Sequence, residues 1–324
     1  MKLRTVLLIW LVALSSCNRP GDSAAVAHPK VIAVATLMSH PSLDEVRSGL
    51  TEGLRSEGLV EGRDYRILDR NANGQIELTG TIAAELEARS PDVIVPITTP
   101  MAQAVHARTS RPLVFAAVTD PVSAGIVRSL DGTPRITGTS DAWPYRQQLE
   151  LIRQIQPQAR RLAVLYNPGE AASQFGIRQI RAAAIALNFT LVEVPVSSSN
   201  EMATAARQAA RQADALFLSS DNTVISAVPA AFAVAVQSHI PLYVGDSGTV
   251  EKGGLAAASV GYRALGRETG RLVARVLRGE DRIPVFVGTD AEISVNARAA
   301  QLMGVQVPPS VLARARHVYN TIRQ

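Results

Sequence analysis

Hydrophobic and polar positions alternate along this chain in blocks that are typical of strands followed by helices. Residues 31–37 are almost uniformly apolar and rich in branched side chains, which predicts a strand covered on both faces. After a polar loop, apolar residues recur every three to four positions over 43–54, which predicts an amphipathic helix with Ser42 as its N-cap. In a parallel sheet such a loop is where ligands gather, because the strand's carboxyl end and the helix's amino end open onto one crevice.

The same unit repeats along the chain and divides it into two matching halves. In the first half we expect strands at 31–37, 64–68, 92–97 and 113–118, and helices at 42–54, 75–89 and 101–108. In the second half we expect strands at 162–165, 191–194, 215–218 and 242–244, and helices at 147–155, 177–187 and 201–213. The pattern predicts an α/β fold of two doubly wound parallel-sheet lobes whose polar loop tips face one cleft.

The remaining elements, at 255–260, 264–277, 285–287 and 296–303, are too few for a third domain. We therefore expect the chain to cross between the lobes near Asp141, near Ala257 and near Pro284. These crossings divide the chain into a first lobe of 29–141 plus 257–283 and a second lobe of 142–256 plus 284–324. A three-crossing hinge lets the lobes close on a ligand without unfolding.

The amino terminus predicts export. Lys2 and Arg4 precede an apolar run at 6–14, which is too short to span a bilayer but has the length of the core of a secretory signal. The run ends just before Cys17, the only cysteine of the chain, so an internal disulfide is excluded. The segment resembles a bacterial lipoprotein signal, which implies a signal peptide at 1–16, lipid such as palmitate on Cys17, and a polar tether at 17–28. The alternative is an ordinary secretory signal that contains a cysteine.

Composition narrows the class of protein. A chain of 324 residues with 47% hydrophobic residues can bury one to three cores, and two is the natural number. The formal net charge is +5, but the arginines are spread over the predicted helices without interleaved aromatic residues, so we expect no nucleic-acid partner. The histidines are scattered without the spacing of a metal site, and we expect neither a metal nor a cofactor.

Two motifs are similar to catalytic ones but lack the rest of the machinery. Residues 245–248 copy the segment around a trypsin-like serine, yet they follow a strand in an α/β chain and have no evident base or orienting carboxylate. Residues 261–268 have the spacing of a phosphate-binding loop, but Arg267 and Glu268 replace the required lysine and hydroxyl. We therefore expect that the protein is not an enzyme.

Polar residues at the predicted strand tips form the candidate ligand site: Ser39, His40, Thr98, Thr99, Thr119, Asp120, Ser140, Asp141, Tyr166, Asp221, Asn222 and Asp246. Hydroxyls and N–H groups at the Thr98–Thr99 tip suit a carboxylate, and the aspartates suit an ammonium group, so an α-amino acid fits. We expect the ammonium near Asp221, with helix capping as the alternative role for Asp221 and for His40.

Aromatic residues are only 4% of the chain, so a sugar ligand, which would ask for more stacking faces, is less favoured. Trp143, Tyr145, Tyr166 and Tyr262 lie near predicted tips or crossings, where one or two of them could line a slot for a ligand side chain.

Several short segments carry a family resemblance, in this order: Ser39-His40-Pro41-Ser42-Leu43-Asp44, Thr99-Pro100, Thr119-Asp120-Pro121, Ser140-Asp141, Asp221-Asn222 and Gly253-Gly254-Leu255-Ala256. Over roughly 30–311 the chain resembles the ABC-transporter substrate-binding lipoproteins that include bacterial tryptophan- and tyrosine-binding components. Met101 and Trp143 depart from that pattern, so the shape of the pocket is open.

The resemblance implies a type I periplasmic-binding-protein fold that delivers a small solute, such as an aromatic amino acid, to an ABC permease and its ATPase. It also implies a place in the cell envelope, lipid-anchored in the periplasm or on the outer face of the cytoplasmic membrane. We expect a monomer. The alternatives are a sensory module that feeds a signalling partner, and a receptor for a nucleobase or a sugar-like solute.

Overall fold

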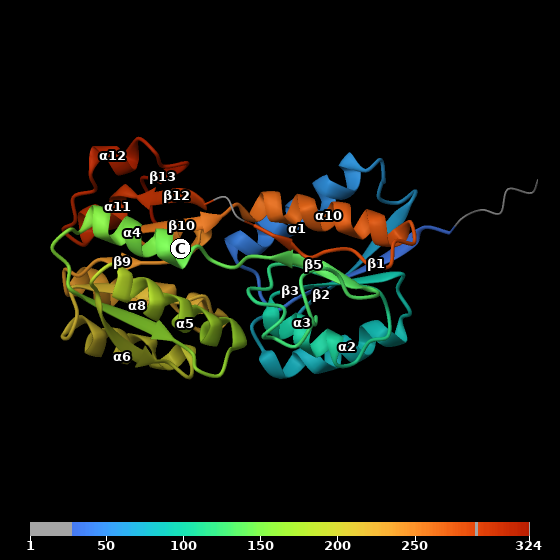
Figure 1. The fold of residues 1–324 in the computed structure, drawn as a ribbon, viewed down its shortest axis with the longest axis horizontal. Coiled ribbons are helices and arrows are strands. Elements are labelled where there is room, and N and C mark those ends of the chain that lie inside the picture. Colours follow the sequence, from blue (N-terminus) through green and yellow to red (C-terminus); the bar gives the residue numbers. More distant parts are fainter. Residues whose placement is uncertain (1–27, 289–290, 324) are drawn as a thin grey trace, which may run out of the picture.

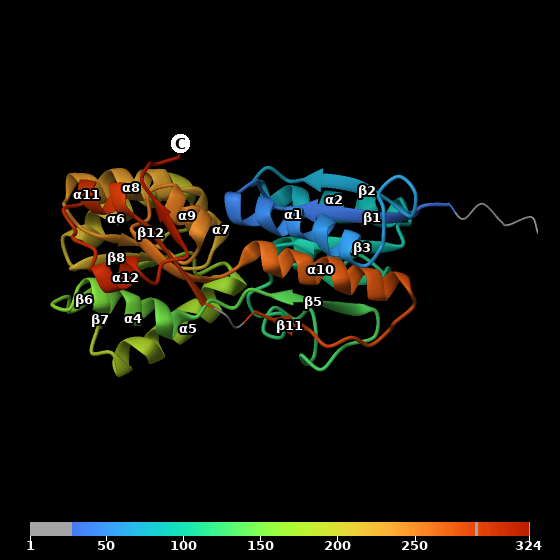
Figure 2. The same cartoon turned by 90° about the horizontal axis from the view of Figure 1, so that it is seen from above.

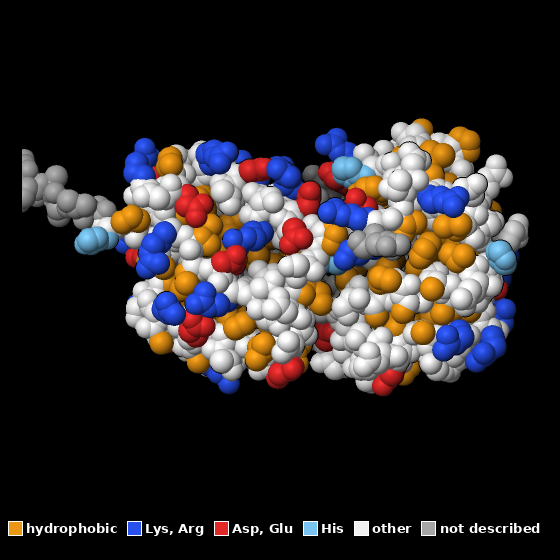
Figure 3. All heavy atoms as spheres, turned by 180° about the vertical axis from the view of Figure 1, so that it is seen from behind, with side chains coloured by type: hydrophobic (Ala, Val, Ile, Leu, Met, Phe, Trp, Pro, Cys, Tyr) orange, Lys and Arg blue, Asp and Glu red, His pale blue; other side chains and the backbone are white. Residues whose placement is uncertain are grey.

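The computed structural model describes residues 28–288 and 291–323, which form two α/β halves side by side (Figure 1). The predicted signal peptide, Cys17 and the tether up to Ala27 lie outside the described residues. Among the helices of the described residues, none is both long enough and apolar enough to cross a membrane. On the face drawn in Figure 3, Lys and Arg side chains are scattered over both halves and are not gathered into one patch.

The first half is a six-stranded parallel sheet in the order β11-β5-β4-β3-β1-β2. Its strands are β1 (Lys30–Thr36), β2 (Tyr65–Asn71), β3 (Val93–Ile97), β4 (Leu113–Phe115), β5 (Ile136–Ser140) and β11 (Phe286–Val287). Its helices are α1 (Pro41–Ser56), the short η1 (Ile76–Leu78), α2 (Thr79–Ala88), α3 (Thr99–His106) and α10 (Tyr262–Leu277). Along β1, Ile32 and Val34 pack under α1 and α10, whereas Ala33 and Ala35 pack under α2 and α3. The sheet is therefore covered on both faces, as its apolar strands predict.

The second half contains a four-stranded parallel sheet, β7-β6-β8-β9, and a three-stranded sheet, β10-β12-β13. Its strands are β6 (Arg161–Tyr166), β7 (Thr190–Pro195), β8 (Ala215–Leu218), β9 (Leu242–Tyr243), β10 (Ala256–Val260), β12 (Ala291–Asn296) and β13 (His317–Tyr319). Its helices are α4 (Tyr145–Ile155), α5 (Ala171–Ala186), η2 (Ser199–Glu201), α6 (Met202–Ala210), α7 (Asn222–Ser226), α8 (Val228–Gln237), α9 (Ser247–Glu251), α11 (Ala297–Leu302) and α12 (Pro309–Leu312). The N–H of Leu255 donates to the Leu242 carbonyl at 2.7 Å, and both sheets share one core.

The predicted α/β fold with parallel sheets is confirmed. Three strands, β5, β12 and β13, were not predicted from the sequence. β5 reads Ile-Thr-Gly-Thr-Ser, a polar segment that hydrophobic patterning does not recognise as a buried strand. Its hydroxyls are nevertheless buried because partners lie within reach: Thr137 donates to the Pro284 carbonyl and Thr139 hydrogen-bonds with Thr269. β12 and β13 are half-exposed additions, and β12 pairs antiparallel with β10, which the expectation of purely parallel lobes did not include.

The crossings between the halves differ in part from the expected ones. The chain leaves the first sheet after β5, near Asp141, and enters α4 in the second half. β10 pairs with β12 in the second half, so the next crossing lies at Gly261 instead of near Ala257. β11 pairs with β5, and the Gly288 N–H donates to the Ser140 carbonyl, so the chain stays with the first half as far as Gly288 and does not cross near Pro284. Sequence patterning locates strands but does not say which sheet a short strand joins.

Helices α1 and α10 lie side by side in both ribbon views (Figures 1 and 2) and make the most extensive helix contact of the first half. Their backbones approach closely at glycines, because a Cβ atom on Gly49 would lie 2.3 Å from the Arg263 carbonyl oxygen. Likewise a Cβ on Gly266 would lie 2.1 Å from the Val46 carbonyl oxygen. This packing fixes the amino ends of both helices at the boundary between the halves.

Candidate functional site

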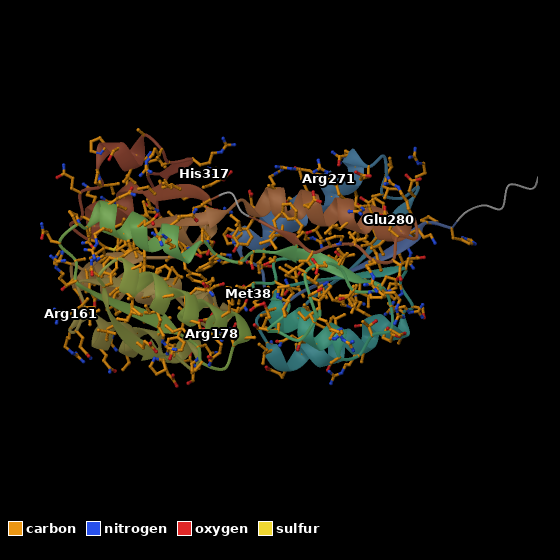
Figure 4. The ribbon with its side chains drawn as sticks, in the orientation of Figure 1. Met38, Arg161, Arg178, Arg271, Glu280 and His317 are labelled. Carbon is orange, nitrogen blue, oxygen red and sulfur yellow. The ribbon has the colours of Figure 1, made fainter. Side chains whose placement is uncertain are left out.

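A cavity of about 50 Å³ lies between the halves, at the carboxyl ends of the parallel strands. The first half and α10 contribute Met38, His40, Ser42, Leu43, Thr98, Thr99, Ala117, Thr119, Asp141 and Tyr262 to its lining. The second half contributes Trp143, Ala172, Ser220, Asp221, Asn222, Ile225 and Asp246. Figure 4 shows Met38 at the boundary between the halves. Both walls of the cavity are thus built from strand tips and helix starts.

Most of the predicted site residues come together at this cavity: His40, Thr98, Thr99, Thr119, Asp141, Asp221, Asn222 and Asp246 line it. Four predicted residues do not line it, each for a local reason. Ser39 is exposed and accepts a hydrogen bond from Asn71, and the Asp120 carboxylate accepts the Ser123 N–H in a turn. Ser140 turns its hydroxyl to the Thr119 carbonyl, and the Tyr166 hydroxyl donates to Glu193.

Other lining residues were not predicted as ligand contacts. Ala117, Ala172, Met38, Leu43 and Ile225 are apolar and carry no chemical signal in a sequence, and Ser220 stands beside the predicted Asp221 tip. Trp143 and Tyr262 belonged to the aromatic residues expected near a side-chain slot, and both line the cavity. The remaining lining residues could have been predicted only from their position in the sequence close to the strand tips.

Thr98, at the end of β3, has the features of an anion-binding position. Its backbone is in a sparsely populated region, with φ of 87° and ψ of 155°, although it is not a glycine. It precedes the first residue of α3, and its side chain does not cap that helix. Its hydroxyl is buried and has no hydrogen-bond partner among the described residues. A buried hydroxyl and the N–H groups of a helix start are thereby left available at the cavity.

Thr119 links this position to a buried carboxylate. The Thr119 N–H lies 3.4 Å from the Thr99 hydroxyl, and the Thr119 hydroxyl donates to Asp141 at 3.1 Å. Burial raises the pKa of Asp141 to about 6, although hydrogen bonds from Tyr262 and Thr119 favour its charged form. Asp141 is therefore a buried carboxylate that a positively charged group would stabilise.

Two crossings of the chain meet at Asp141 through a chain of hydrogen bonds. The Trp143 indole N–H donates to the Tyr262 hydroxyl at 2.9 Å, and that hydroxyl donates to Asp141 at 3.0 Å. Gly245 makes room for the indole, since a Cβ atom there would lie 1.5 Å from the Trp143 ring. Trp143 thus lines the cavity and is linked to Asp141 through Tyr262.

Asp221, on the opposite wall, is a helix cap. One carboxylate oxygen accepts the Val224 N–H at 2.6 Å, and the other accepts the Asn167 N–H at 2.9 Å and the Ser173 hydroxyl at 3.2 Å. Burial and the neighbouring Glu170 raise the pKa of Asp221 to about 8. The capping role, which the sequence left open as the alternative, is thus observed.

Asp246 caps α9 and also reaches the first half. Its carboxylate accepts the Thr249 N–H at 2.9 Å and the hydroxyls of Thr249 and Ser42. His40, not Ser42, is the N-cap of α1, because its Nδ1 accepts the Ser42 N–H at 3.3 Å. Burial lowers the pKa of His40, which favours a neutral ring. His40 thus has the capping role that the sequence offered as an alternative.

The two motifs similar to catalytic ones have structural roles. Residues 245–248 lead into the short helix α9, and residues 261–268 form the start of α10, where Gly266 packs against α1. Within residues 28–288 and 291–323, no cluster of His, Cys, Asp and Glu side chains is placed to hold a metal ion.

Comparisons with known proteins agree with this geometry. The family model described as ABC transporter substrate binding protein matches residues 31–319. A tyrosine-binding protein of Clostridioides difficile (strain R20291) is 32% identical over 296 residues, which are 90% of this chain and 85% of that protein.

Two solved structures are equally similar in sequence and differ in shape. The structure of an ABC domain in complex with L-Trp from Streptococcus pneumonia is 32% identical, covers 90% of this chain and 99% of its own, and has a TM-score of 0.86. The ligand-free, open structure of a substrate binding protein with adhesive properties from Clostridium difficile has the same identity and coverage and a TM-score of 0.70. The arrangement of the two halves described above is thus more similar to that of the L-Trp complex than to the open form.

The resemblance in the sequence and the type I periplasmic-binding-protein fold are both confirmed. The chain belongs to the ABC transporter substrate-binding protein family, whose members bind solutes and are not enzymes.

Proposed function

We propose that this chain is the substrate-binding component of an ABC importer, that it captures an α-amino acid with a large apolar or aromatic side chain, and that it delivers it to a permease. The observation that carries the proposal is the Thr98 position. There a buried hydroxyl, left without a partner by the described residues, stands with the start of α3 at the wall of the cavity. A ligand carboxylate would satisfy both the hydroxyl and the helix N–H groups.

The neighbouring Asp141 supports a zwitterionic ligand. The carboxylate and the ammonium of an α-amino acid are attached to the same carbon atom, so their binding groups must be adjacent. Thr119 contacts both Thr99 and Asp141, which brings the anion-binding position and a buried carboxylate together on one wall. We therefore assign the ammonium to Asp141 in place of Asp221, because one oxygen of Asp221 caps α7 and the other accepts hydrogen bonds from Asn167 and Ser173.

The rest of the lining suits an apolar side chain. Met38 and Leu43 from the first half and Ile225 and Trp143 from the second half place apolar surface around the polar residues. The C. difficile relative is named for tyrosine and the S. pneumonia structure holds L-Trp. These relatives favour an aromatic amino acid for this chain as well.

The ligand class is tested by calorimetric titration with matched compounds. We expect L-tryptophan and L-tyrosine to bind, whereas tryptamine, which lacks the carboxylate, and N-acetyl-L-tryptophan, which lacks the ammonium, should bind at least about a hundredfold more weakly because each leaves a buried group unpaired. Adenine and ribose serve as controls for the alternative solutes. Binding of adenine or ribose without binding of any amino acid would overturn the proposal.

The site of action is proposed from the amino terminus. Lipid on Cys17 would hold the protein at the cell envelope, on the outer face of the cytoplasmic membrane, next to its permease and ATPase. Cys17→Ala should move the protein from the membrane pellet to the soluble fraction on fractionation, with ligand affinity unchanged. A Cys17→Ala protein that stays in the pellet would contradict the lipid anchor. A strain that lacks this protein and still takes up L-tryptophan or L-tyrosine at the normal rate would contradict the importer role.

A further inference from the structure

The two halves touch directly where α1 and α9 begin, beside the cavity. The Ser42 hydroxyl donates to the Asp246 carboxylate across the boundary, and the Gly248 N–H lies 3.3 Å from the Ser42 oxygen. The Thr249 hydroxyl lies 3.4 Å from Nε2 of His40. Ser42, His40, Asp246 and Thr249 are all buried, so this contact is shielded from water.

These groups form one consistent set of donors and acceptors. Nδ1 of His40 accepts the Ser42 N–H, so in the neutral ring the proton is on Nε2, which donates to the Thr249 hydroxyl. That hydroxyl donates in turn to Asp246, which also accepts from Ser42. Every hydrogen bond of this network has a protein donor and a protein acceptor. The bonds from His40 to Thr249 and from Ser42 to Asp246 join the two halves.

We propose that the contact between the amino ends of α1 and α9 is a latch that holds the two halves closed independently of any ligand, and that Gly248 is the residue that permits it. The latch goes beyond the proposed function, because none of its hydrogen bonds passes through a bound solute. It predicts that the ligand-free protein already populates the closed arrangement.

Gly248 is the most sensitive part of the latch. A Cβ atom there would lie 2.7 Å from the Ser42 oxygen, 2.9 Å from Cβ of Pro41 and 2.9 Å from the Ser42 nitrogen, all of which belong to the opposite half. Gly248 lies within α9 and its φ is not in the left-handed region, so alanine suits its own helix. A methyl group at this position would therefore act as a wedge only in the closed arrangement.

The latch acts on the hinge through α1 and α10. These helices are packed backbone to backbone at Gly49 and Gly266, and α10 begins directly after the crossing at Gly261. α1 cannot slide on α10 without a clash. A contact made by Ser42 and His40 at the start of α1 therefore also fixes the crossing at Gly261, which leads into α10.

The test measures the separation of the halves in the ligand-free full chain. Spin labels on Arg66→Cys in the first half and Arg207→Cys in the second, both exposed, report this separation by double electron–electron resonance in a full chain whose native Cys17 is replaced by alanine. The parent should show a short-distance population. Gly248→Ala should abolish it, and Ser42→Ala, which removes a hydrogen bond to a carboxylate, should reduce the closed-to-open ratio about tenfold or more.

Gly80→Ala is the matched control, because it adds a methyl group to α2 where only the end of the flexible Arg108 side chain comes near, at 3.2 Å. It should leave the distances unchanged, and thermal unfolding should show that all variants are folded. Equal distance distributions for the parent, Gly248→Ala and Ser42→Ala would overturn the latch, as would a parent with only the long distance. The distances are measured without L-tryptophan. If L-tryptophan failed to bind in the calorimetric titration, the proposed function would be wrong, but the distance measurement would still test the latch.

Discussion

The two walls of the cavity contain buried aspartates with different duties. On the second-half wall, Asp221 and Asp246 each accept the N–H of the third residue of a short helix, so a carboxylate oxygen of each is used to start α7 or α9. On the first-half wall, Asp141 accepts hydrogen bonds from the hydroxyls of Thr119 and Tyr262, and no helix starts directly after it. The capping aspartates serve the fold, whereas Asp141 keeps capacity for a cation.

This difference shows that burial alone does not identify a ligand carboxylate. Asp221 has the larger rise in pKa, to about 8, compared with about 6 for Asp141, because both are buried and Glu170 lies near Asp221. The identity of the donors is the better guide, since backbone N–H groups at a helix start are always present, whereas side-chain hydroxyls can be shared with a ligand.

The largest expected effect is on ligand binding by Asp141→Asn. The substitution keeps the size of the side chain and removes the charge that pairs with the ligand ammonium. Charge-assisted hydrogen bonds contribute about 1.5–3 kcal/mol, so affinity for L-tryptophan should fall about ten- to a hundredfold or more in a calorimetric titration. Unchanged affinity would show that the ligand ammonium does not bind Asp141, and Asp221 or Asp246 would then be the candidate.

Asp221→Asn should affect stability more than binding. Asparagine still caps α7, but its NH₂ group then faces the Asn167 N–H, so a buried donor loses its acceptor. We expect the free energy of unfolding to fall by about 1–3 kcal/mol in urea denaturation, with affinity for L-tryptophan changed less than by Asp141→Asn. A loss of affinity without a loss of stability would reverse the roles of the two aspartates.

The pH dependence of binding should report Asp141. With a pKa of about 6, its carboxylate is mostly charged at pH 7 and about one tenth charged at pH 5, so affinity should fall about tenfold over that range. The stability of the ligand-free protein should respond in the opposite direction. A carboxyl group whose pKa rises on folding stabilises the fold at pH values below its unfolded pKa, and that contribution is lost as the pH rises through 6.

This pH dependence has a control in the same chain. Asp141→Asn should bind weakly at both pH values and lose the tenfold change, as seen by titration at pH 5 and pH 7. A tenfold change that persists in Asp141→Asn would assign the titration to another group, such as His40.

The smallest expected effect is that of Thr98→Val, which removes the hydroxyl proposed to bind the ligand carboxylate. The N–H groups of α3 remain, so affinity should fall only about three- to tenfold. Stability should be unchanged or slightly higher, because in the described part of the chain this hydroxyl lacks a hydrogen-bond partner. Thr98→Ser, which keeps the hydroxyl, should bind L-tryptophan like the parent, and equal affinities of the two variants would remove Thr98 from the site.

The sequence by itself determined the alternation of strands and helices and most of the polar residues that line the cavity. Apolar strands such as β1 and β3 and the amphipathic α1 are encoded locally, and polar residues at the ends of parallel strands must meet at one edge. That reasoning found Thr98, Thr99, Thr119 and Asp141, which are all strand-tip residues of the first half.

Only the tertiary structure decided which sheet the short strands join and which aspartate is engaged elsewhere. The polar strand β5 is buried because Thr269 and the Pro284 carbonyl lie across from it, and neither is near it in the sequence. Asp221 is engaged by Asn167 and Ser173, and Ser42 meets Asp246 from the other half of the molecule. Hydrogen bonds between distant segments depend on how the halves pack, and local patterning contains no information about that packing.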